Sequence, residues 1–428
     1  MTQVVENEDL FTDIYSDNST CASSYSTLKN SKDGWRIIDW NKEAVGVLSD
    51  ESKWTQPSSV DVTVIQDRLV YVKRDDHLRL QGSQIAGNKA RKMLALNNLK
   101  DFPLCVVSYG GPQSNAMVAL AAVVNFQNIK QGIDDHHDPH RCRFIYYTKK
   151  LPKFLRNQPT GNLFRAKMLG IEMIELPPEE YRTLFGGKWG ANTHAPQGLT
   201  PPVPGDSLWI PQGGSSGMAH AGTRLLAQEI CEFWSLKGNG RPLSVAIPGG
   251  TCSTAVLVHT AIESLQSKLS NDKQMDIKVV VIPCIGDDTY ARRQMMALNT
   301  QLGNASNDLP TILKPSPFDL ATQHNHKHSD KYFTFGEPEK DILETFVYIK
   351  EKCDITLDLL YGAPAWAVLL RHWKGKQTSP SVFDANAPFA DRSVMYVHSG
   401  GIEGVNTQLL RYRYKGLLKT KDVQLPNH

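Results

Sequence analysis

A lysine at position 89 stands in the stretch GNKARK, directly after Gly87 and Asn88 and at the start of a segment with helical periodicity. Arg91 and Lys92 follow it at two and three residues. Positive neighbours disfavour the charged form of an amine, so this arrangement favours a lysine that is partly deprotonated. A deprotonated amine is a nucleophile that can add to a carbonyl. Taken alone, such a lysine is more often a surface residue at a helix start.

A second chemical signal is the stretch IPGGTCSTAVL at 247–257, which is typical of a strand, a glycine turn and a helix. Backbone N–H groups of Gly249, Gly250 and Thr251 would converge at the positive end of the helix dipole. The hydroxyls of Thr251 and Ser253 add further donors, so the turn could bind a phosphate. It lacks the Lys-Ser/Thr of a nucleotide-hydrolysing P-loop and the GxGxxG spacing of a dinucleotide fold. An ordinary strand-to-helix turn is the alternative.

A nucleophilic lysine and a phosphate-binding turn in one chain are what pyridoxal 5'-phosphate requires, because that cofactor carries an aldehyde and a phosphate. We therefore predict pyridoxal phosphate as the cofactor.

The stretch SYGGPQSN at 108–115 ends a strand and opens a helix, and its polar residues are a third signal. Asn115 at a helix N-terminus could donate to the phenolate oxygen of the cofactor, and Ser114 could steer the substrate or move a proton. Ordinary capping of the helix by these residues is the alternative.

The elements that position these residues alternate along the chain. We predict a hairpin over 62–76 and then strands and helices in turn, which indicates an α/β fold with parallel sheets flanked by helices. Four strands end in Gly-Gly, at 110–111, 213–214, 249–250 and 400–401, which suggests close approach of backbone to one ligand. The expected strands are 104–111, 142–149, 171–176, 207–214, 243–250, 277–286 and 393–401, and the expected helices are 115–128, 161–170, 218–234, 252–266 and 287–299.

Several motifs, in this order, resemble the 1-aminocyclopropane-1-carboxylate deaminase and D-cysteine desulfhydrase family of fold-type II, tryptophan synthase beta-like pyridoxal-phosphate enzymes. The resemblance covers about residues 58 to 415. It rests on GNKARK, GGPQSN, IPGGT, LYGAPAW and VHSGG. It implies that Lys89 binds the cofactor covalently, that Asn115 contacts its phenolate oxygen, and that Gly249, Gly250 and Thr251 hold its phosphate. Ser114 and Tyr361 are expected at the substrate, Ser399 and Gly400 beside the cofactor, and the protein is expected to be a homodimer.

The resemblance also implies two α/β domains with the cofactor in the cleft between them. We expect a polar N-terminal extension over 1–54, a small domain over 98–215, and a large pyridoxal-phosphate-binding domain that combines 55–97 with 216–428.

Two residues depart from the family pattern. Gly362 follows Tyr361 where the family has a side chain that faces the pyridine nitrogen, and Phe335 stands where a tyrosine is usual. A ring without an acidic partner is a weaker electron sink. We therefore expect a lyase or deaminase that acts by α,β-elimination on a small amino acid, as D-cysteine desulfhydrase does, and releases a keto acid and ammonia.

Two other functions remain open from the sequence. The departures are also compatible with a catalytically degenerate protein that only binds pyridoxal phosphate. The stretch GGSSG at 213–217 has the G-x-S-x-G form of an α/β-hydrolase, with Ser215 as nucleophile, His398 as base and Asp358 or Asp384 as the acid.

Composition narrows the classes of partner. A net charge of +3, from 47 basic and 44 acidic residues, provides no strong field for nucleic acid or membrane. The seven scattered cysteines suggest free thiols, and no apolar run is long enough for a transmembrane span. The cytoplasm is the expected location. The histidine-rich loops with His136, His137 and His140, and with His324, His326 and His328, do not match a zinc pattern, so we expect no metal.

Overall fold

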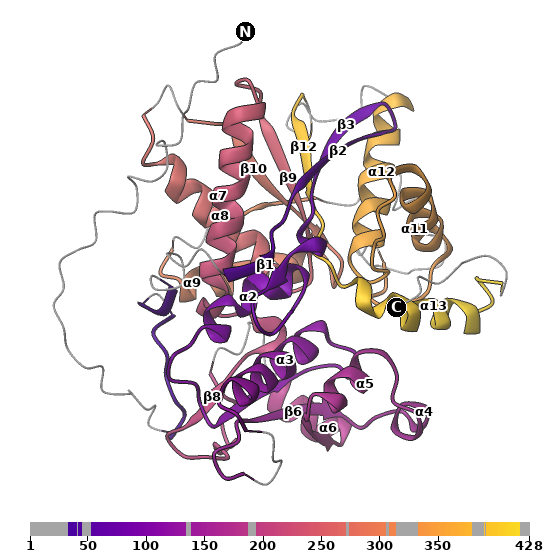
Figure 1. The fold of residues 1–428 in the computed structure, drawn as a ribbon. Coiled ribbons are helices and arrows are strands. Elements are labelled where there is room, and N and C mark those ends of the chain that lie inside the picture. Colours follow the sequence, from indigo (N-terminus) through magenta and orange to yellow (C-terminus); the bar gives the residue numbers. More distant parts are fainter. Residues whose placement is uncertain are drawn as a thin grey trace.

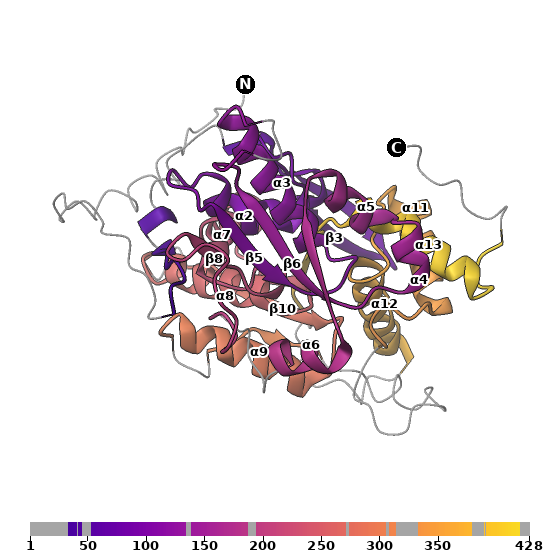
Figure 2. The ribbon, with the colours of Figure 1, turned by 90° about the horizontal axis from the view of Figure 1, so that it is seen from below.

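The computed structural model describes residues 33–40, 42–44, 53–133, 138–186, 194–270, 274–304, 308–313, 333–378, 389 and 391–419. In this part of the chain two separate parallel-type sheets are flanked by helices (Figures 1 and 2), which confirms the predicted α/β class.

The larger sheet has six strands in the order β11-β10-β9-β12-β3-β2. The four strands from β11 to β12 are parallel to one another, β3 is parallel to β12, and β2 is antiparallel to β3 at the edge. The bounds are β2 Val60–Ile65, β3 Arg68–Lys73, β9 Leu243–Gly249, β10 Ile277–Pro283, β11 Thr311–Ile312 and β12 Ser393–Val397.

The hairpin of β2 and β3 forms where the sequence predicts it. Its register pairs Ile65 with Arg68, which leaves Gln66 and Asp67 as a two-residue turn. Both have positive φ, 50° and 58°. Two-residue turns with positive φ at both positions match the right-handed twist of the paired strands.

The smaller sheet has four parallel strands in the order β7-β6-β5-β8. They are β5 Cys105–Tyr109, β6 Arg143–Lys149, β7 Glu172–Leu176 and β8 Ser207–Trp209, all from the central third of the sequence. Helices α3 (Asn115–Lys130), α4 (Lys153–Asn157), α5 (Gly161–Met168) and α6 (Pro178–Phe185) surround this sheet (Figure 1). The domain bounds themselves stay a prediction.

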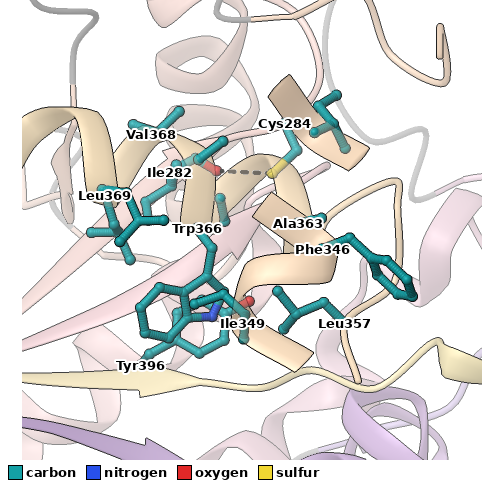
Figure 3. Packing of buried hydrophobic residues seen from close by; sticks show 14 of the residues in the cluster. Ile282, Cys284, Phe346, Ile349, Leu357, Ala363, Trp366, Val368, Leu369 and Tyr396 are labelled. Carbon is teal, nitrogen blue, oxygen red and sulfur yellow. Dashed lines mark hydrogen bonds between the residues drawn. The ribbon is translucent and has the colours of Figure 1, made fainter. Parts of the chain in front are cut away.

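Helices lie on both sides of the six-stranded sheet (Figure 1). On one side are α7 (His220–Lys237), α8 (Ser253–Gln266) and α9 (Asp288–Gln301), and on the other are α11 (Lys340–Cys353) and α12 (Gly362–Thr378). Sequence analysis did not predict α11, α12 or α13 (Val405–Tyr414). Trp366 of α12 is fully buried against Tyr396 of β12, as Figure 3 shows. This packing anchors α12 to the sheet.

Part of the polar N-terminal segment packs against the smaller sheet. Trp35 is 6% exposed and meets Trp209 edge-on at 6.0 Å between ring centroids. The buried guanidinium of Arg36 pairs with Asp101 at 2.6 Å and with Asp206 at 2.9 Å. The segment around residue 35 is therefore tied to the fold despite its weak periodicity.

Helix α2 (Gly87–Asn97) carries Lys89. The other elements of the described residues are short: the strands β1 (Trp54–Gln56) and β4 (Arg79–Leu80), and the 3₁₀ helices η3 (Asp75–His77), η4 (Gln212–Gly214), η5 (Gly217–Ala219) and η8 (Ile402–Gly404). Within the described residues, every helix is too short or too polar to cross a membrane.

Candidate active site

A cavity of about 910 Å³ is lined by residues from the segments around both sheets. It is lined from the large-sheet side by Lys89, Gly250, Thr251, Tyr361, Ser399 and Gly400, and from the small-sheet side by Ser114 and Asn115. Eight of the nine predicted site residues thus share one cavity, whose volume is in the range of small-molecule sites. Gly249, the ninth, ends β9 behind the turn and does not line it.

The amine of Lys89 is poised for nucleophilic chemistry. Lys89 lies in the first turn of α2 and makes no hydrogen bond or ion pair with other described residues. Burial disfavours its ammonium form and lowers its pKa to about 8. About a tenth of the amine is therefore uncharged at pH 7, far more than for an exposed lysine.

Arg91 does not supply the positive charge that the sequence suggested beside Lys89. Its fully buried guanidinium binds Asp75 at 2.7 Å and Glu229 at 2.8 Å. The two carboxylates neutralise its charge. The pKa of Lys89 is lowered by burial instead, and Arg91 ties α2 to η3 and α7.

Lys92 forms a compact polar cluster with three hydroxyl groups. Its Nζ donates to Ser253 Oγ at 2.6 Å and to the Gly213 carbonyl at 3.2 Å. Ser215 Oγ donates to Thr251 Oγ1 at 2.8 Å and to Ser253 Oγ at 3.2 Å. Burial, followed by the charge of Lys89, lowers the pKa of Lys92 well below its usual value. A bound anion would reverse that shift, because a negative charge favours the ammonium form.

The turn that leads into α8 lies beside this cluster and has the predicted geometry. Cys252, the residue before α8, adopts a left-handed conformation with φ of 56°. The N–H groups at the start of α8 and the positive end of its dipole also favour an anion, together with the four side chains of the cluster. Sequence analysis predicted the turn and the hydroxyls but missed Ser215 and the role of Lys92.

The surroundings of Gly87 explain why the GNK motif begins with a glycine. Its φ is +67°, and a Cβ there would lie 2.5 Å from the Ser399 carbonyl oxygen and 3.0 Å from Gly400 Cα. Asn88 N–H also donates to the Ser399 carbonyl at 2.9 Å. A glycine at 87 thus lets the start of α2 rest directly on the loop after β12.

Asn115 is held in a fixed orientation at the start of α3. Its Oδ1 accepts from Asn162 Nδ2 at 2.6 Å, so its own amide NH₂ is turned away from Asn162. Asn162 also donates to the Gln113 carbonyl at 3.0 Å. Asn162, which sequence analysis did not identify, therefore orients Asn115 as a donor.

Ser114 is the N-cap of α3, the ordinary role that the sequence offered, and it also lines the cavity. Its role at the substrate stays a prediction. Its Oγ accepts from Met117 N–H at 3.4 Å. The hydroxyl of Tyr146 donates to the Gly111 carbonyl at 3.2 Å. Tyr146, a further residue missed from the sequence, therefore holds the Gly-Gly turn that precedes Ser114.

Tyr361 packs between the glycine turn and Phe335. Its ring lies 5.5 Å from that of Phe335, and a Cβ on Gly250 would lie 3.0 Å from its Cε1. Burial raises the pKa of Tyr361, so the phenol is a proton donor over the ordinary pH range. A second phenol, Tyr290 of α9, lines the same cavity. It was also not identified from the sequence.

Asp358 occupies the space beside Gly362. It accepts from the N–H groups of Leu360, Tyr361 and Gly362 at 2.8–2.9 Å and so caps α12. A Cβ on Gly362 would lie 3.0 Å from Asp358 Oδ2. The position therefore offers no side chain to the cavity and little room for one.

The hydrolase triad does not assemble among the described residues. Ser215 bonds to Thr251 and Ser253, whereas His398 Nε2 bonds to the Thr356 carbonyl at 2.8 Å. Asp358 is used as a helix cap, and Asp384 lies outside the described residues. Among the residues that the structure describes, Ser215 thus has no base within hydrogen-bond reach.

His136, His137, His324, His326 and His328 lie outside the described residues. Within the described part of the chain, no three His, Cys, Asp or Glu side chains form a group that could hold a metal ion.

Comparisons with known proteins agree with the motifs. A scan against family models finds no match. The chain is 35% identical over 117 residues to the Thermotoga maritima protein named "Putative 1-aminocyclopropane-1-carboxylate deaminase", a match that covers 27% of this chain and 31% of that protein. The aligned part thus spans about a third of the length of this curated relative.

A crystal structure of an ACC deaminase homologue superposes on this chain with a TM-score of 0.55 at 18% identity, and covers 88% of this chain and 99% of that one. The two comparisons bear out the resemblance seen in the motifs, and the chain has the fold of this ACC deaminase homologue.

Proposed function

We propose that the protein is a pyridoxal-phosphate-dependent lyase or deaminase that acts on an amino acid and uses Lys89 as its covalent attachment point. One observation carries the proposal. The same cavity holds a buried lysine amine of lowered pKa and, at the start of a helix, the cluster of Lys92 with hydroxyl side chains, which is suited to an anion. A lysine amine can bind the aldehyde of pyridoxal phosphate, and an anion site can bind its phosphate.

The residues present fit the cofactor. Lys92, Thr251 and Ser253 would hold the phosphate together with the N–H groups of the turn after Gly249 and Gly250. Asn115, fixed as a donor by Asn162, would face the phenolate oxygen, and Ser399 and Gly400 would lie beside the ring. When bound, pyridoxal phosphate withdraws electrons from the α-carbon of an amino acid and so eases loss of its α-proton.

The roles of the protein groups follow from their protonation. Lys89, once displaced by the substrate amine, would be the general base that takes the α-proton, because its amine is uncharged in part near neutral pH. Ser114 and the N-terminus of α3 would hold the substrate carboxylate. Tyr361 stays protonated and would donate a proton to the leaving group.

We propose α,β-elimination on a small amino acid, as in D-cysteine desulfhydrase, rather than opening of a cyclopropane ring. Among the described residues that line the cavity, Glu403 provides the sole carboxylate, and Gly362 provides no side chain for the ring nitrogen. A ring without an acidic partner favours substrates with a good leaving group. We expect ammonia release from D-cysteine to exceed that from 1-aminocyclopropane-1-carboxylate. The reverse order at a sustained rate would refute this choice of reaction.

The same proposal includes the division into two domains, their closure over the substrate, the oligomeric state and the location of the protein. With domain bounds of 55–97 plus 216–428 and of 98–215, the cofactor would lie in the cleft between two lobes, because residues from both ranges line the cavity. Lobe closure would exclude water from the reaction. A homodimer is expected from the family resemblance, and the cytoplasm is expected from the scattered cysteines and the sequence composition.

The decisive variant is Lys89→Ala. We expect the purified wild-type protein to show the visible absorbance band of lysine-bound pyridoxal phosphate, and the variant to lack it. We also expect the variant to lose at least about a thousandfold in rate, since Lys89 is both attachment point and base. An intact band in the variant would refute the assignment. A wild-type band that responds to no D- or L-amino acid would instead favour a degenerate, non-catalytic cofactor-binding protein.

A further inference from the structure

The cavity continues from Lys89 to an exposed rim that none of the proposed catalytic steps uses. The rim carries Arg165 of α5, Glu403 of η8 and Arg411 of α13, all of which line the cavity. Both arginine side chains are exposed, whereas the amine of Lys89 is buried. These three charged residues are called the rim here.

The two arginines of the rim come from two helices that meet, α5 and α13. Gly161 of α5 and Thr407 of α13 meet so closely that a Cβ on Gly161 would lie 2.3 Å from Thr407 Oγ1. Arg165 lies one turn after Gly161, and Arg411 lies one turn after Thr407. Residues four apart share a helix face. Both guanidinium groups therefore flank the junction of the two helices.

Neither arginine makes a hydrogen bond or an ion pair with another residue in the described ranges. The nearby carboxylate of Glu337 is bound to Lys415 at 2.6 Å. The rim itself thus carries two positive charges against the one negative charge of Glu403. Surface arginines are usually held by carboxylates or simply solvated, so two unbonded ones on the wall of a cavity indicate a ligand with negative charge.

Apolar side chains lie beside these charges. Phe164 (51% exposed), Met168 (72%) and Phe335 (43%) line the same part of the cavity. Exposed apolar groups next to guanidinium groups suit a side chain that has carbon atoms along its length and an acidic group at its end.

We infer that the amino-acid substrate carries a second anionic group at the end of its side chain, and that Arg165 and Arg411 bind this group at the rim. The inference rests on the proposed function. If Ser114 and the start of α3 hold the α-carboxylate and the α-carbon lies near Lys89, the side chain is the part of the substrate that reaches outward.

The test compares O-phosphoserine with O-acetylserine, each as D and L forms, on the holoprotein. The first has an acidic side-chain end, and the second is neutral there. We expect a higher kcat/KM, and tighter binding followed through the absorbance of the bound cofactor, for O-phosphoserine. Arg165→Gln and Arg411→Gln should each reduce this preference by about threefold to tenfold, as expected for partly exposed charge pairs. Glu403→Gln should increase it.

Matched controls lie on the same helices. Lys167→Gln of α5 and Arg413→Gln of α13 remove an exposed positive charge that does not line the cavity, and should leave the preference unchanged. The inference is overturned if the wild type shows no preference, if O-phosphoserine causes no response, or if the controls act as strongly as the rim variants. Any of these results, with the cofactor still attached to Lys89, leaves the proposed function standing. Absence of cofactor on Lys89 refutes the proposed function itself.

Discussion

Lys89 owes its reactivity to where it is buried. An exposed lysine has a pKa of about 10.4, and burial lowers that of Lys89 to about 8. The folded protein disfavours the ammonium form, so this group reduces stability below pH 8. In the cofactor-free protein that cost disappears as pH rises from about 8 towards the pKa of the unfolded chain.

This shift predicts the pH dependence of Lys89 chemistry. In protein stripped of cofactor, the rate of acetylation of Lys89 by acetic anhydride should rise with a midpoint near pH 8, because only the uncharged amine reacts. Peptide mass spectrometry over a pH series measures the rate at Lys89 and at exposed lysines in one sample. A midpoint for Lys89 that coincides with those of exposed lysines would contradict the burial argument.

The sequence could identify those site residues that follow a glycine within about four residues at strand and helix ends. Lys89, Ser114, Asn115 and Thr251 are all of this kind, and all line the cavity. Their supporting partners could not be found because they come from distant segments. Ser215 lies 36 residues from Thr251, and Asn162 lies 47 residues from Asn115. Only folding brings these pairs together.

Among the elements, α2 depends on a glycine contact with the loop after β12. Gly87→Ala would place a Cβ 2.5 Å from the Ser399 carbonyl oxygen, at a φ of +67°. We expect the start of α2 to shift, with a loss of roughly 2–4 kcal/mol from left-handed strain and overpacking and weaker binding of pyridoxal phosphate. Urea unfolding and equilibrium dialysis measure the two effects.

Gly132→Ala is the matched control, because Gly132 has a φ of +70° but nothing within 4 Å of its would-be Cβ. It should show the strain of roughly 1–2 kcal/mol alone. Equal losses for the two variants would mean that the contact with Ser399 is not important.

Most elements that carry the site were predictable because the spacing of their apolar residues clearly indicates a strand or a helix. The strand of 243–250 and the helix of 252–266 correspond to β9 and α8 within a few residues. Helix α11 was missed because it follows a long polar stretch. Helix α12 begins within the motif LYGAPAW, which was not extended into a helix. Trp366 shows why α12 forms, as its burial against Tyr396 depends on contacts between distant segments.

At the level of the whole molecule, Arg91 links three elements through a buried ion network. It binds Asp75 of η3 and Glu229 of α7, and Lys73 of β3 also binds Glu229 at 2.7 Å. The positive charges of Arg91 and Lys73 hold the pKa of Glu229 at about 2. Removal of one partner leaves a buried charge without compensation.

Arg91→Met should therefore destabilise the protein by roughly 3–5 kcal/mol, because Asp75 would stay buried without its partner. Arg143→Met is the control, since the Arg143–Glu172 pair is about half exposed and should cost roughly 1 kcal/mol or less. Urea unfolding of both variants measures the difference. A loss for Arg91→Met as small as that of the control would show that the network does not hold these elements together.

The two sheets meet at a cavity whose lining is drawn from both, and the account depends on one bond in that cavity. Reduction of the purified holoprotein with borohydride, digestion and peptide mass spectrometry would locate any cofactor adduct. We predict a reduced pyridoxal phosphate adduct on the peptide with Lys89 and none on Lys92. An adduct on another lysine, or an unmodified Lys89 in protein loaded with cofactor, would contradict the assignment.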